Sequence, residues 1–233
     1  MEKRKKPYAK TAKVNADDKR IDALKEQLRS NPIAIVDYER HVIMKEVYEK
    51  NVGYQQIIKR ARLAEALFER KKIYIDDNLF VGSITGDVNG VYPYPEWNVG
   101  WMKDEKTVEK SKTPEEKAAN QWALDYWDER AVKPRVEEIL RNRFGYDPDA
   151  IYGSGLVVSF HDWPGGGGNL NYPLVYQQGL ASVIKDCEER MMSADMRLPN
   201  ASKLYFWESA VITMKAIIRW SHRYAELARE KAA

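Results

Sequence analysis

Apolar side chains recur at helical spacing in several separate stretches of this 233-residue chain, and this periodicity most constrains its fold. Ile35, Tyr38, Val42 and Val47, for example, follow one another every three to five residues, with charged residues between them. Such a stripe marks an amphipathic helix, which becomes stable when its apolar face packs against another element. Further helices are predicted over residues 21–28, 54–71, 135–144, 173–192 and 203–231, and one that begins at the capping motif Thr113-Pro114-Glu115-Glu116.

Two segments rich in glycine, proline and aromatic residues interrupt the helical pattern. Residues 82–101 and 151–173 have no period, and aromatic residues such as Tyr92 and Trp101 give the first segment enough area to pack as an ordered loop. Before it, Ile73-Tyr74-Ile75 is typical of a short strand. The sequence therefore predicts a mainly α-helical body with short β segments and two irregular loops that can converge.

Positive charge is concentrated in the first residues. The formal net charge is +3, whereas residues 1–13 carry six Lys or Arg against one Glu, a surplus of five, so the remaining residues carry −2. A face for nucleic acid would place positive charge on the folded body, so we expect no nucleic-acid partner. We expect residues 1–20 to form a basic disordered tail and residues 21–233 to form the folded portion.

The single cysteine, Cys187, excludes an internal disulfide and any site that needs two thiolates. No stretch approaches the roughly 18 consecutive apolar residues of a membrane span, and the first residues lack the apolar run of a secretory signal. We therefore expect a soluble, cytoplasmic protein with no membrane partner. No group of His, Cys and carboxylate residues has metal-ligand spacing, so we expect no metal site.

Four sequence segments, taken in order, carry a family resemblance. They are Asp37-Tyr38-Glu39-Arg40 with the helix and short strand that follow to Gly82, the loop ending Tyr94-Pro95-Glu96-Trp97, the segment Asn169-Leu170-Asn171-Tyr172, and the final helix with Arg223-Tyr224-Ala225-Glu226. This series resembles the opening of glycyl radical enzymes of the pyruvate formate-lyase-like family, over about residues 33–233.

The resemblance implies a much longer chain built on a ten-stranded α/β barrel, of which these residues form the amino-terminal helical layer. In that family a glycine near the carboxyl end carries a stable radical, installed by a separate activating enzyme that uses S-adenosylmethionine and an iron–sulfur cluster. The radical passes to a cysteine, and the resulting thiyl abstracts a hydrogen from a small organic substrate in a shielded pocket. A role in anaerobic metabolism is expected on the same grounds.

Neither radical group is identifiable in this sequence. Cys187 lies in Lys185-Asp186-Cys187-Glu188-Glu189, far from any Gly-Cys-Val-Glu-like motif, and no Arg-Val-x-Gly-Tyr-like radical loop is present. We predict no catalytic residue, no bound cofactor and no activity for this chain alone. It would be the amino-terminal part, or the small subunit, of a glycyl radical lyase whose large radical-bearing subunit or missing sequence holds both groups. The alternative is a non-catalytic binding or regulatory homologue.

The candidate substrate-binding residues are His161, Trp163, Asn169, Asn171 and Trp97. Asn169 stands where the resemblance implies a pocket histidine in dehydratase-type members, so an amide that cannot transfer a proton replaces an imidazole. His161 either restores an imidazole to the pocket or is a surface-loop histidine. Trp97 and Trp163 either line a pocket for an apolar substrate or anchor their loops by packing.

Three other features have structural interpretations. His41 and His222 are expected to be structural residues on their helices. The glycines at residues 165–168 give the backbone freedom for a tight path, because a phosphate-binding loop would also carry Gly-Lys followed by Ser or Thr.

Overall fold

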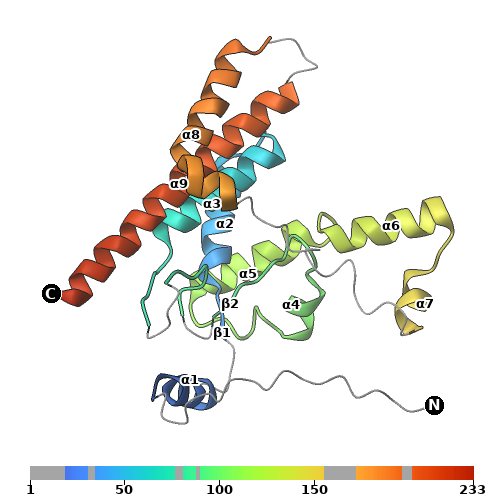
Figure 1. Cartoon of the computed structure of the whole chain (residues 1–233). Helices are drawn as coiled ribbons and strands as arrows, with labels where there is room; N and C mark the ends of the chain where they lie inside the picture. Colours follow the sequence, from blue (N-terminus) through green and yellow to red (C-terminus); the bar gives the residue numbers. More distant parts are fainter. Residues whose placement is uncertain (1–18, 31–34, 77–80, 88–89, 155–171, 196–200) are drawn as a thin grey trace, which may run out of the picture.

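The computed structural model describes residues 19–30, 35–76, 81–87, 90–154, 172–195 and 201–233 (Figure 1). These residues form nine helices and two short strands. The elements are α1 (Lys19–Ser30), β1 (Ile35–Val36), α2 (Glu39–Lys50), α3 (Gln56–Arg70), β2 (Gly90–Val91), α4 (Gly100–Asp104), α5 (Pro114–Trp127), α6 (Val132–Phe144), α7 (Pro148–Gly153), α8 (Tyr172–Ser193) and α9 (Ala201–Ala232). The prediction of a mainly helical chain is confirmed, and none of the described helices is long and apolar enough to cross a membrane.

Local signals in the sequence fix several helix ends. Thr113 caps α5, since its side-chain oxygen accepts a hydrogen bond from the backbone N–H of Glu116 at 3.1 Å, and Pro114 occupies the first helical position. Gly145 ends α6 in the left-handed conformation, with φ of 67°, which glycine adopts without steric cost. Gly179, with φ of 74° and ψ of 164°, interrupts α8 in a way that the apolar pattern did not predict.

The predicted strand at Ile73-Tyr74-Ile75 is wrong. Residues 71–76 form no ladder, whereas the two described strands pair in parallel with Ile35 opposite Gly90 and Val36 opposite Val91. A strand needs a neighbour for its backbone groups, and β-propensity alone does not provide one. The helix expected from Ile35 begins only at Glu39, because residues 35–36 pair with the loop before Tyr92.

The main core lies between α2, α3, α5 and the loop that contains α4. Met44, Met102 and Ala123 are fully buried there, and Tyr92 and Trp101 pack against this core, as predicted for an ordered loop. Aromatic rings contact one another in the same region, with Tyr48 lying 5.5 Å from Tyr126 and 5.7 Å from Trp127, both edge to face. This core holds the loop of residues 90–99 against α2.

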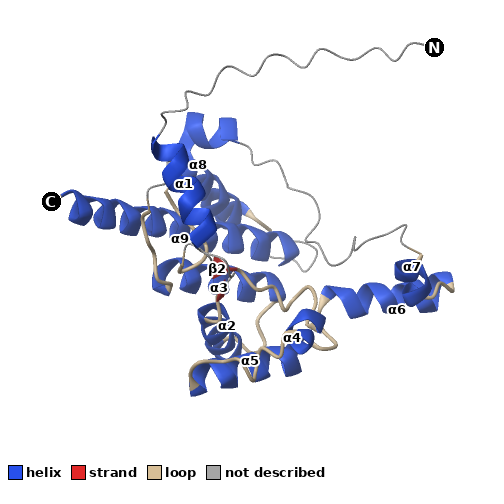
Figure 2. Ribbon diagram, turned by 90° about the horizontal axis from the view of Figure 1, so that it is seen from below, coloured by secondary structure: helices blue, strands red, loops and turns tan. Residues whose placement is uncertain are grey.

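A second, smaller core joins α8 and α9 through Ile184, Cys187 and Val211. The α9 helix also lies along α3, where Arg219 pairs with Glu65 at 2.9 Å and Arg223 donates to the backbone oxygen of Lys71 at 2.7 Å. The views in Figures 1 and 2 show that the α8–α9 hairpin and the α6–α7 segment extend from the body in different directions. Among the described residues, these two parts thus project from the main core.

Candidate functional site

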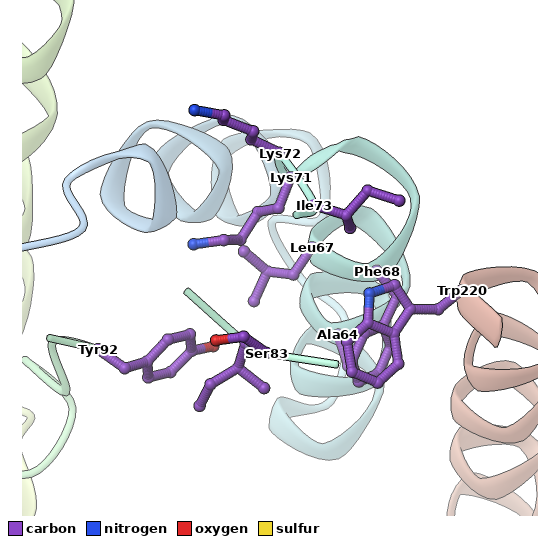
Figure 3. A pocket seen from close by; sticks show the side chains of 10 residues that line it. Ala64, Leu67, Phe68, Lys71, Lys72, Ile73, Ser83, Tyr92 and Trp220 are labelled. Carbon is purple, nitrogen blue, oxygen red and sulfur yellow. The ribbon is translucent and has the colours of Figure 1, made fainter. Parts of the chain in front are cut away.

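A pocket of about 90 Å³ lies between α3, α9 and the segments that flank residues 77–80 (Figure 3). Phe68 and Trp220 form one end, with ring centroids 4.9 Å apart, and Tyr92 stands at the other. Ala64, Leu67, Ile73 and Ile84 supply the apolar lining, while Lys71, Lys72 and Ser83 add polar groups. This small pocket combines an apolar lining with cationic and hydroxyl groups.

Beside the pocket, Lys71 and Asp37 form a buried ion pair. Their side chains are 6% and 7% exposed, and the same Asp37 carboxylate accepts a hydrogen bond from the backbone N–H of Gly86 at 3.1 Å. The pair therefore connects the end of α3, the start of α2 and the loop around Gly86. Two charges taken out of water are tolerated because each is paired and hydrogen-bonded.

A second buried ion pair, Arg40 with Glu96, lies close by. The guanidinium donates two hydrogen bonds to the carboxylate, one of them from Nη1 to Oε2 at 3.1 Å, which is a bidentate geometry. Burial opposes the charge on Arg40, but Glu96 and then Tyr92 outweigh it and raise the pKa of Arg40. The pair ties the α2 helix to the end of the loop of residues 90–97.

Tyr92 lies between the two cations. Its ring centroid is 4.6 Å from the Arg40 guanidinium carbon and 5.7 Å from the Lys71 ammonium nitrogen. Burial raises the pKa of Tyr92 although Arg40 opposes the shift, so the phenol is neutral at pH 7. We call Asp37, Lys71, Arg40, Glu96 and Tyr92 the buried charge cluster.

The buried charge cluster is suited to positioning. It contains no thiol, imidazole or free carboxylate, and each of its four charges has an opposite partner. Its hydrogen bonds instead fix two points of the loop, Gly86 and Glu96, against α2 and the end of α3. The sequence pointed to Asp37, Arg40 and Glu96 only through the family resemblance. Lys71 and Tyr92 were missed as members of the cluster, because nothing in the sequence separates the buried Lys71 from its exposed neighbour Lys72.

A second, wider cavity of about 660 Å³ opens beside β1 and β2. Its lining is charged with both signs, from Lys72, Lys110 and Lys112 and from Glu39, Asp87, Glu105 and Glu116. Two of these charges pair with each other, Lys110 with Glu105 at 3.0 Å. The cavity therefore carries charges of both signs, with carboxylates in excess.

His41 is structural, as predicted. The ring is fully buried on α2, and Nδ1 lies 2.6 Å from the side-chain oxygen of Asn120 on α5. Burial lowers the pKa of His41 to about 4, so the imidazole is neutral at pH 7. His222, in contrast, is exposed on α9 and lines neither cavity, so it makes no part of the core.

Four of the five predicted substrate-binding residues, His161, Trp163, Asn169 and Asn171, lie outside the described residues. The fifth, Trp97, is half-buried and lines neither of the two cavities; its backbone oxygen accepts a hydrogen bond from the N–H of Lys133 at 2.9 Å. Its place in a substrate pocket stays a prediction.

Cys187 is 6% exposed in the α8–α9 core and lines neither cavity. Burial, and then the charge of Asp186, raise the pKa of its thiol. This setting does not fit a cysteine that must reach a substrate. The described residues also contain no group of His, Cys, Asp and Glu that could hold a metal ion.

Comparison with known proteins finds relatives along most of the chain. The (2S)-3-sulfopropanediol dehydratase of Klebsiella oxytoca is 25% identical over an alignment of 231 residues, which covers 91% of this chain and 27% of that protein. Among solved structures, one from work on 1,2-propanediol dehydration in Roseburia inulinivorans aligns with 97% of this chain and 29% of its own, at 23% identity and a TM-score of 0.70. A glycyl radical enzyme from Archaeoglobus fulgidus aligns with 91% of this chain and 28% of its own, at 21% identity and a TM-score of 0.72.

The fold of this chain is therefore that of a region within these longer proteins, and the chain spans 27% of the length of the Klebsiella relative. The sequence model of the pyruvate formate lyase-like family matches residues 11–233, which is nearly the whole chain. The chain thus belongs to the pyruvate formate lyase-like family.

Proposed function

We propose that this chain is the amino-terminal part, or the small subunit, of a glycyl radical lyase that breaks a C–C, C–O, C–N or C–S bond in a small organic substrate. The single observation that carries the proposal is the family match over residues 11–233. The chain spans less than a third of the length of the relatives it matches. The radical glycine and the thiyl cysteine then belong to another polypeptide or to further sequence, together with the activating enzyme that installs the radical.

The setting of the single cysteine supports this division of roles. A thiyl must meet its substrate in a shielded pocket. Cys187 instead packs between α8 and α9 and lines neither cavity. This chain's contribution is then to bind and orient the substrate, through His161, Trp163, Asn169, Asn171 and Trp97.

Exposed apolar side chains on the last two helices support a large partner. Tyr176 and Met192 on α8 are 83% and 87% exposed, and Phe206 on α9 is 58% exposed. Large apolar side chains left this exposed on two adjoining helices favour a surface that another part of a protein covers. The alternative, a stand-alone regulatory homologue, would instead need these helices to present a polar surface.

The relatives' names include dehydratases, but dehydration needs a group that protonates the departing hydroxyl. Asn169 cannot do this, because an amide only donates and accepts hydrogen bonds. If the reaction is a dehydration, we propose that His161 supplies the imidazole.

The proposal is tested by anaerobic co-expression of this chain, an activating enzyme and the radical-bearing polypeptide. The radical-bearing polypeptide is sought first among the neighbouring reading frames, where a Gly-Cys-Val-Glu-like loop and a carboxyl-terminal radical glycine would identify it. We expect turnover only when all three are present. Asn169→Ala should raise KM, whereas Asn142→Ala, an exposed change on α6, should leave it unchanged. Full turnover by the radical-bearing polypeptide without this chain would refute the proposal and favour the regulatory alternative.

A further inference from the structure

The pocket beside the buried charge cluster has an apolar end and a polar end (Figure 3). Phe68 and Trp220 close the apolar end, whereas Lys71 and Tyr92 lie at the opposite end. The ion pair with Asp37 fixes Lys71, whose side chain is only 6% exposed. The polar end is therefore built into the fold and needs no ligand to assemble it.

Lys71 keeps hydrogen-bond donors for a ligand. An ammonium group carries three N–H donors and no acceptor. Among the described residues, Asp37 is the only side chain that accepts a hydrogen bond from this ammonium. A buried donor without an acceptor costs free energy, so the other two N–H groups need a partner. Because Lys71 lines the pocket, a molecule bound there can provide it.

Tyr92 is a second donor at the same end. Its phenol is neutral at pH 7 and therefore keeps its hydrogen. Arg40 can only donate, so the phenol oxygen accepts the hydrogen bond between these two side chains and the O–H of Tyr92 is left to donate. Figure 3 shows the Tyr92 ring pointing from its loop toward Ser83, across the polar end of the pocket.

The Ser83 hydroxyl is already used within the protein. The Thr85 hydroxyl donates to the backbone oxygen of Asp87 at 3.0 Å, so Ser83 is the donor in the 2.7 Å contact between the two hydroxyls. The Ser83 hydroxyl oxygen also accepts the backbone N–H of Thr85 at 3.1 Å. The polar side chains of the pocket therefore offer mainly donors to a ligand.

These donors favour a carbonyl oxygen over other oxygen groups. A water molecule or an alcohol would accept from the donors but would turn its own O–H toward an apolar lining. An anion would bury an unbalanced charge, because Asp37 already balances Lys71. A carbonyl oxygen accepts hydrogen bonds through two lone pairs and donates none.

The volume of the pocket limits the size of this ligand. An apolar cavity of about 150 Å³ holds benzene, so the 90 Å³ found here holds roughly four non-hydrogen atoms. We therefore propose that the pocket binds a small aliphatic ketone or aldehyde, with its oxygen toward Lys71 and Tyr92 and its alkyl groups against Phe68 and Trp220. All of these residues belong to this chain, so binding needs no radical-bearing partner.

Acetone and 2-propanol are matched probes of this site, because they have the same number of non-hydrogen atoms and differ in the oxygen group. Each is titrated into this chain, and the shift of the Trp220 indole N–H signal in ¹H–¹⁵N NMR gives its Kd. Acetone should bind at least about fivefold more tightly than 2-propanol. Equal affinities, tighter binding of 2-propanol, or no saturable shift would overturn the inference.

Matched variants locate the bound oxygen. Tyr92→Phe removes one donor and keeps the ring, so it should weaken acetone binding about three- to tenfold. Tyr94→Phe removes a hydroxyl from a tyrosine that does not line the pocket and should change the Kd by less than about twofold. Equal acetone affinity in both variants would contradict the assigned polar end.

A third variant keeps the site testable if Tyr92→Phe fails to fold. Ala64 lines the pocket, and Ala64→Leu adds alkyl carbons to a space that holds roughly four non-hydrogen atoms, so it should abolish acetone binding. Circular dichroism checks that this variant is folded. Unchanged acetone binding by folded Ala64→Leu would place the ligand elsewhere and overturn the inference.

Discussion

Removing the Glu96 carboxylate should strongly destabilise the chain. Arg40 is 3% exposed and Glu96 is 11% exposed, so Glu96→Ala leaves a guanidinium buried beside the rings of Tyr92 and Tyr94 without a countercharge. Breaking a buried ion pair in this way costs about 3–5 kcal/mol, because the remaining charge stays out of water. The backbone oxygen of Glu96 accepts a hydrogen bond from the N–H of Val132 at the start of α6, so a loop that shifts when the ion pair is lost should also loosen that helix.

Urea unfolding followed by circular dichroism measures the effect. With a denaturant slope of about 2–3 kcal/mol per M, the midpoint of Glu96→Ala should fall by about 1–2.5 M. The matched control is Glu46→Ala, which removes the partner of Arg70 from an ion pair of 2.7 Å whose side chains are 45% and 42% exposed. That pair is solvated and worth about 0–1 kcal/mol, so the control should shift the midpoint by less than about 0.5 M.

A double variant separates the lost charge from the lost packing. In Arg40→Met combined with Glu96→Leu no charge stays buried, so the pair of changes should destabilise less than Glu96→Ala alone. Equal midpoint shifts for Glu96→Ala and Glu46→Ala would refute the conclusion that the buried charge cluster holds the loop.

Three further predictions concern single residues. The pKa of His41 is lowered to about 4 from the ordinary 6.5, so the unfolded chain binds this proton more readily than the folded chain. The contribution of the neutral His41 ring to folding stability is therefore complete above pH 6.5, and about 3 kcal/mol of it is lost as the pH falls to about 4. The ring signals in NMR should titrate near pH 4, and titration near 6.5 would contradict burial. Thr113→Ala should cost about 1 kcal/mol in urea unfolding and Thr113→Ser much less, since serine keeps the capping oxygen that Glu116 N–H uses; equal losses would rule out the cap. Gly179→Ala should cost about 1–3 kcal/mol, because φ of 74° with ψ of 164° is strained for any residue with a Cβ, and an unchanged melting temperature would show that α8 is not interrupted there.

The helices were predictable because their signals are local. Thr113-Pro114 and Gly145 mark helix ends within a few residues, and the apolar stripes of α3, α8 and α9 need no knowledge of the rest of the fold. The strands were not predictable, because pairing joins Ile35 to Gly90 across more than fifty residues. The propensity of Ile73-Tyr74-Ile75 was real but had no backbone partner.

The buried charge cluster shows the same limit for the site. Asp37 and Lys71 are ordinary surface residue types in the sequence, and only the packing of α2, α3 and the loop brings them together out of water. Tyr92 was placed in an ordered loop by composition, but its position between two cations depends on that loop's path. The family resemblance, by contrast, needed only short motifs in the right order, and the family match confirmed it.

Electron paramagnetic resonance tests the central claim most directly. One sample contains this chain, an activating enzyme and S-adenosylmethionine under anaerobic conditions, and the second sample also contains the radical-bearing remainder. In both samples [2-¹³C]glycine is incorporated into this chain alone. The proposed function predicts no glycyl radical from this chain by itself, and a signal without ¹³C broadening from the complete mixture. A glycyl radical on this chain alone, or a signal broadened by its ¹³C label, would contradict it.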